Sequence, residues 1–72
     1  MFRKKFDRLI EIVTEEHTFA RNKYMQYTKL AEEARESGFQ SRYDIYFRCA
    51  EEYLQQAIAL QDLKKRLLRE LG

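Results

Sequence analysis

Apolar and aromatic residues recur every seven positions along most of the chain, with a second apolar position about halfway between them. This spacing is typical of a helix that buries one side, and no segment shows the strict alternation of a strand. The repeat runs through Phe6, Val13, Ala20, Tyr27 and Ala34, and then through Tyr43, Ala50 and Ala57. We therefore expect an all-α fold.

Gly38 divides this pattern into two halves. It is the only glycine before the last residue, and the chain contains no proline. Glycine readily takes the left-handed conformation that ends many helices, and Ser41 with Asp44 three residues later is typical of a helix start. The chain is therefore expected to reverse direction at Ser37-Gly38.

These signals predict an antiparallel helical hairpin made of two long helices. We expect the first helix at about residues 2–37, the turn at 37–40 and the second helix at about 41–71, all within one domain of residues 1–72. A break in the first helix at Val13-Thr14, which would give three helices, remains open.

Some of the halfway positions are apolar doublets, so the apolar stripe is wider than one partner helix can cover. The doublets are Leu9-Ile10, Tyr46-Phe47 and Leu67-Leu68. Packing of two hairpins into a four-helix bundle would cover it. We expect a homo-oligomer, or a complex with another helical protein, and a non-enzymatic role as a protein–protein interaction, adaptor or structural module. The expected interface residues are Leu9, Ile10, Val13, Tyr24, Tyr46, Phe47, Tyr53, Leu54, Leu67 and Leu68.

The net charge of +2 is unevenly distributed. Residues 1–11 and 62–72 contain eight lysines and arginines against four acids, whereas residues 12–61 contain six against eight. The open end of the hairpin should thus be basic, which gives a nucleic-acid-binding protein as an alternative. Lysines and arginines also suit a helix C-terminus without any ligand. The candidate phosphate-binding residues are Arg3, Lys4, Lys5, Lys64, Lys65, Arg66 and Arg69.

The remaining composition indicates a cytoplasmic protein. Cys49 is the only cysteine, so no disulfide can form within the chain. The basic start of the chain does not run into an apolar segment, and no stretch is apolar enough to span a bilayer. The segment Phe2–Phe6 raises binding to a membrane surface as a less favoured alternative, since it is short and has no second anchoring signal.

Four glutamates and a histidine raise a second alternative, a ferritin-like protein with a di-metal site between subunits. The segment Ala20–Tyr24 resembles the rubrerythrin branch of the ferritin-like proteins. That resemblance, however, places His17, Tyr53 and Gln56 at positions where the family has metal ligands. We therefore expect no metal, no other cofactor and no catalytic residues. The residues that raised this alternative are Glu15, Glu16, His17, Glu51 and Glu52.

A longer segment, Tyr27 to Tyr53, carries a more specific pattern. Its defining residues are Tyr27, Leu30-Ala31, Glu33-Ala34, Ser37-Gly38, Tyr46-Phe47, Ala50-Glu51 and Tyr53. This segment resembles a small helical domain of unknown function near the N-terminus of many alphaproteobacterial proteins, and also one tetratricopeptide helix pair. Phe39 replaces the aspartate usual in that domain. The resemblance implies a helix pair and self-association, and it implies no activity.

Overall fold

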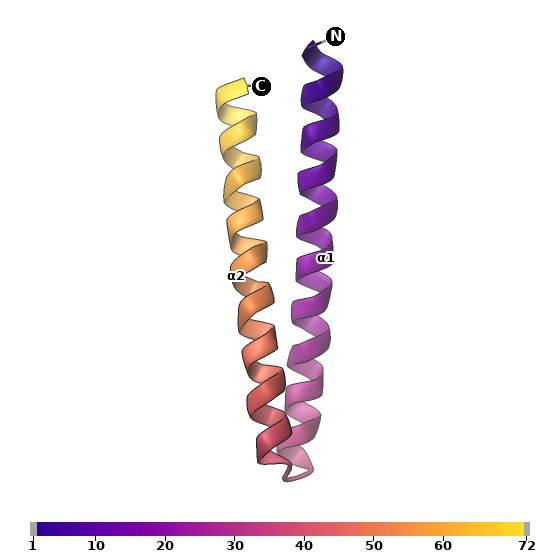
Figure 1. Ribbon diagram of the computed structural model, residues 1–72, viewed down its shortest axis with the longest axis vertical. Coiled ribbons are helices and arrows are strands. Elements are labelled where there is room, and N and C mark those ends of the chain that lie inside the picture. Colours follow the sequence, from indigo (N-terminus) through magenta and orange to yellow (C-terminus); the bar gives the residue numbers. More distant parts are fainter. Residues whose placement is uncertain (1, 72) are drawn as a thin grey trace.

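The computed structural model shows two antiparallel helices packed side by side (Figure 1). It describes residues 2–71, with side chains from residue 3 onward. Helix α1 spans Phe2–Glu36 and helix α2 spans Gln40–Leu71, so the expected all-helical hairpin is confirmed. Met1, Gly72 and the side chain of Phe2, which belong to the expected domain and to the Phe2–Phe6 segment, lie outside the described residues.

Gly38 ends α1 in the left-handed conformation, with a φ of 78°. The amide of Gly38 donates to the carbonyl of Arg35 at 3.1 Å, and the amide of Phe39 donates to the carbonyl of Ala34 at 2.9 Å. This pair of hydrogen bonds is the Schellman motif, which satisfies carbonyls that the helix end would otherwise leave unpaired. Backbone hydrogen bonds at Gly38 and Phe39 therefore close the turn at the end of α1.

Helix α2 begins at Gln40, within one residue of the expected start at about residue 41. The predicted start signal at Ser41 and Asp44 is wrong, because Ser41 already lies inside α2 and Asp44 accepts a hydrogen bond from the side-chain amide of Gln40 at 3.0 Å. The amide of Tyr43 donates to the carbonyl of Phe39 at 2.9 Å. The chain is therefore already helical before Ser41, and no serine cap is needed to start α2.

Helix α1 continues through Val13 and Thr14. The Thr14 hydroxyl donates to the carbonyl of Ile10 at 2.7 Å, and Thr28 makes the equivalent bond to Tyr24 at 2.8 Å. A threonine that bonds back to its own helix satisfies its hydroxyl without leaving helical geometry. The β-branched pair at Val13-Thr14 therefore does not interrupt the helix.

The buried core between the helices is narrow and built from small side chains. The buried residues are Val13, Ala20, Ala31, Ala34, Ala50 and Ala57. Small residues at these positions allow the two backbones to approach closely, but they remove little apolar surface from water. Among the described residues, no large side chain is fully buried. The molecule is correspondingly a rod of 55 × 15 × 12 Å.

Candidate interaction surface

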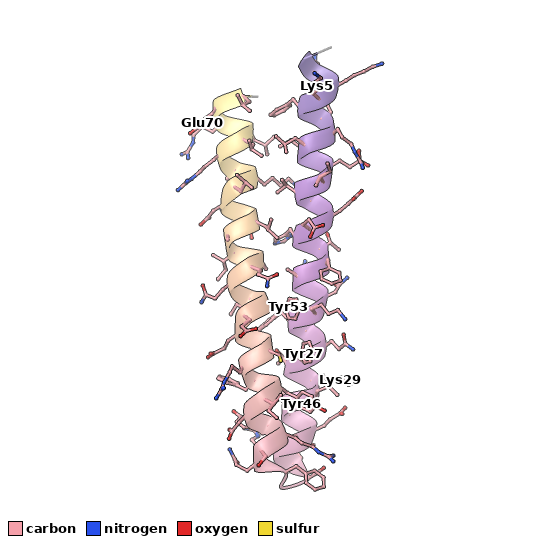
Figure 2. The ribbon with its side chains drawn as sticks, in the orientation of Figure 1. Lys5, Tyr27, Lys29, Tyr46, Tyr53 and Glu70 are labelled. Carbon is pink, nitrogen blue, oxygen red and sulfur yellow. The ribbon has the colours of Figure 1, made fainter. Side chains whose placement is uncertain are left out.

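The larger apolar side chains form layers between the helices near the turn. Tyr27 of α1 lies between two tyrosines of α2, with ring centroids 5.8 Å from Tyr53 and 6.2 Å from Tyr46 (Figure 2). On the other side of Tyr53, Phe19 meets it edge to face at 6.3 Å. These contacts fix which residues of α1 and α2 lie at the same level, and each ring remains partly accessible.

The structure shows which member of each apolar doublet packs toward the other helix. On α1 the second member of each doublet turns toward α2: Ile10 is half-buried where Leu9 is exposed, and Ala31 is buried where Leu30 is half-buried. On α2 the first member turns inward: Leu67 is half-buried where Leu68 is exposed. The outward members of the doublets therefore lie beside the seam, on the two broad sides of the hairpin.

One broad side, which we call the Phe47 face, is hollowed by a groove of about 310 Å³. Tyr24, Thr28 and Ala31 of α1 line it together with Phe47 and Leu54 of α2. Phe47 stacks on Tyr43 at 5.7 Å and keeps 46% of its surface exposed. At seven-residue spacing the face continues along α2 from Leu54 through Gln61 to the exposed Leu68. It is an apolar surface supplied mainly by α2.

The other broad side, which we call the Phe19 face, has a shallower groove of about 200 Å³ near the turn. Leu30, Glu33 and Arg42 line this groove. Residues at seven-residue spacing from these three extend the face toward the open end. Lys23 extends over the Phe19 ring, 5.7 Å from its centroid. We define this face by the residues at seven-residue spacing from Leu30, Glu33 and Arg42, and its apolar members are Leu9, Ile12, Phe19, Leu30, Cys49 and Leu63.

The ten expected interface residues divide among the seam and the two faces. Val13 is buried between the helices, and Ile10, Tyr24, Tyr46, Tyr53 and Leu67 are half-buried on the seam. Leu9 belongs to the Phe19 face, whereas Phe47, Leu54 and Leu68 belong to the Phe47 face. Residues that the sequence pattern did not single out also stand exposed. They are Ile12, Phe19, Met25, Ile45, Ile58 and Leu63, and the seven-residue spacing of Ile12 and Phe19 is the signal that could have found them.

No known family model, curated protein or solved structure matches the chain. The resemblance of Tyr27–Tyr53 to the alphaproteobacterial helical domain and the tetratricopeptide pair therefore stays a prediction, as does the weaker likeness of Ala20–Tyr24 to rubrerythrin. Any functional assignment rests on the geometry of the hairpin itself.

The seven candidate phosphate-binding residues come together at the open end of the hairpin, where both termini lie (Figure 1). Arg3, Lys4 and Lys5 come from the start of α1, and the other four come from the last turns of α2. Lys64 is half-buried and the remaining six are exposed. Acidic residues lie among them: Glu11 pairs with Arg8 at 3.0 Å, and Asp7, Asp62 and Glu70 lie in the same segments.

Side chains that could carry other chemistry are dispersed. His17 is half-buried on the seam of α1, Cys49 is a half-buried free thiol, and Glu15, Glu16, Glu51 and Glu52 are exposed. Within residues 2–71, no three histidine, cysteine or acidic side chains lie close enough together to hold a metal ion. Neither helix of the described chain has a stretch of apolar sequence that matches a bilayer span.

Proposed function

We propose that this chain is a non-enzymatic protein–protein interaction module that acts by associating with itself into a four-helix bundle. The observation that carries this proposal is the size of its exposed apolar side chains: the core of the hairpin is one valine and five alanines, whereas leucines, isoleucines and phenylalanines stand on both broad sides. A fold that buries its small residues and exposes its large ones is completed by association.

The surface area supports the same proposal. The hairpin exposes 6008 Å², whereas a compact monomer of its mass exposes about 4,800 Å². The excess of roughly 1,200 Å² exceeds the ~800 Å² that each partner contributes to a standard-sized protein interface. The radius of gyration of 16.2 Å, against about 11 Å for a compact domain of this length, reflects the same elongated shape.

Light scattering coupled to size exclusion tests the proposal. The chain mass is 8.8 kDa, and we expect the purified protein to elute at twice that mass at micromolar concentration. A folded, helical protein that elutes at the mass of one chain at all concentrations would contradict it. Far-ultraviolet circular dichroism on the same fractions distinguishes a folded monomer from an unfolded chain.

A second function, nucleic-acid binding, is favoured by the convergence of the basic residues at one end of the rod. Phosphate contacts predict an affinity that falls steeply as salt rises. A filter-binding titration with a short DNA duplex and a short RNA at several salt concentrations tests this. Replacing Lys4, Lys5 and Lys65 by glutamine should then weaken binding and flatten the salt dependence, and absence of binding at low salt removes the candidate.

A further inference from the structure

We infer that the Phe19 face binds the same face of a second copy of this chain, with the two turns at opposite ends of the bundle. This inference rests on the proposed self-association and adds its surface and its direction. Three rows of residues on the Phe19 face support this inference. The end of each row nearest the turn is a residue that lines the groove: Leu30, Glu33 or Arg42.

The first row lies on α1 beside the seam and consists of Leu9, Glu16, Lys23 and Leu30, spaced by seven. In a left-handed bundle, residues at this spacing stay on one side of the helix. If the row is aligned with its own reverse, leucine is paired with leucine and lysine with glutamate. An antiparallel copy of α1 would therefore place Leu9 opposite Leu30 and Glu16 opposite Lys23, twice around the two-fold axis.

The second row lies further out on α1 and consists of Lys5, Ile12, Phe19, Gln26 and Glu33. Reversal places Lys5 on Glu33 and Phe19 on itself, whereas Ile12 falls on the polar Gln26. Phe19 is 52% exposed in the single hairpin, and contact with a second Phe19 would bury part of this solvent-exposed aromatic ring. The midpoint of this row, Phe19, is also the middle residue of α1.

The third row lies on α2 and consists of Arg42, Cys49, Gln56, Leu63 and Glu70. Reversal places Arg42 on Glu70, Cys49 on Leu63 and Gln56 on itself. Lys5 and Glu70 lie at the open end on different helices (Figure 2), whereas Glu33 and Arg42 lie beside the turn. One two-fold axis near Phe19 and Gln56 therefore brings opposite charges together at both ends of both helices.

The net charge of the two ends selects the same direction. The open end carries four more positive than negative charges, and the body between residues 12 and 61 carries two more negative charges. Turns at the same end would bring two basic open ends together, whereas turns at opposite ends separate them by the length of the rod. On the Phe47 face the same reversal also brings opposite charges together near the ends, Asp7 with Arg35 and Asp44 with Lys65. The two faces differ at the middle of α1, where Arg21 on the Phe47 face would lie next to Arg21 of the second copy.

Disulfide crosslinking tests the direction in the full chain with Cys49 replaced by alanine. Gln56→Cys places a thiol on the expected two-fold axis, and Gln55→Cys, also an exposed glutamine, places one on the outer side of α2. Under mild oxidation with oxidised glutathione, we expect Gln56→Cys to form a linked dimer severalfold faster than Gln55→Cys. Phe19→Cys against Met25→Cys, which is 55% exposed on the outer side of α1, repeats the comparison on the other helix.

The outcomes separate the two proposals. Preferential linkage at positions 56 and 19 supports the opposed arrangement. A protein that has the mass of two chains but links no faster at position 56 than at position 55 overturns this arrangement and leaves self-association standing. A protein with the mass of one chain overturns both.

Discussion

Tyr27 of α1 stacks on Tyr53 of α2, with ring centroids 5.8 Å apart and the ring planes 8° from parallel. This contact joins the two helices across the turn half of the hairpin, where the neighbouring positions are occupied by buried alanines such as Ala50. Aromatic pairs contribute about 0.5–1.5 kcal/mol beyond the area that they bury. The tyrosines therefore supply much of the interhelical contact that the alanine core does not.

Truncation of Tyr27 should show this contribution. We expect Tyr27→Ala to lower the free energy of unfolding by about 2–3 kcal/mol, less than the cost at a fully buried aromatic site because Tyr27 is half-buried. Urea denaturation at one fixed protein concentration measures it. Tyr27→Phe keeps the stacked ring and should stay close to the unchanged protein. Equal losses in the two variants would show that the stack is not the stabilising feature.

Ala20 should tolerate no enlargement, since it is the most buried residue of the hairpin at 1% exposure. Ala20→Leu adds three carbons between closely packed helices, and we expect it to cost about 1–3 kcal/mol of unfolding free energy. Ala59→Leu, on the exposed side of α2, is the matched control and should be near neutral. A stabilised Ala20→Leu protein would mean that the helices lie further apart than the structure shows.

The glycine at the turn should be required for its backbone conformation and for nothing else. A Cβ at Gly38 would meet no atom within 4 Å, so Gly38→Ala introduces no clash. The left-handed conformation at φ 78° nevertheless costs an L-residue about 1–2 kcal/mol. Thermal unfolding should show this loss for Gly38→Ala and a smaller one for Gly38→Asn. An unchanged midpoint in Gly38→Ala would indicate another turn conformation.

The sequence predicted the two helices and the reversal at Gly38, because heptad spacing and a single interior glycine leave few other solutions. It did not predict which member of each doublet packs inward, since both leucine and isoleucine at Leu9-Ile10 are apolar and only the helix rotation decides. The rotation of each helix about its own axis also decides that Phe19 and Phe47 lie on opposite broad sides of the hairpin. The start of α2 was predicted to within one residue, but its cause was not, because the turn geometry rather than a capping serine precedes Gln40.

Phe19 and Phe47 provide a matched pair for locating the interface. They are the same residue, 52% and 46% exposed, on opposite broad sides of the hairpin. We expect Phe19→Ser to shift the mass measured by light scattering toward one chain at concentrations where Phe47→Ser still has the mass of two. Dissociation by Phe47→Ser alone would place the interface on the other face.

The charge rows predict a compensating pair of substitutions. Glu16→Lys places a lysine opposite Lys23 of the second copy, so dimer dissociation measured by dilution should become easier. Lys23→Glu in the same chain reverses both charges and should restore the affinity. Glu15→Lys, which makes the same charge change on the outer side of α1, is the control. A double variant weaker than Glu16→Lys would contradict the pairing.

The most direct test of self-association is the unfolding midpoint as a function of protein concentration, followed by circular dichroism. If folding and dimerisation are coupled, each tenfold increase in concentration adds about 1.4 kcal/mol per dimer and should raise the midpoint by roughly 4–5 °C. A cooperative transition with the same midpoint from low micromolar to hundreds of micromolar would show that one hairpin is stable alone.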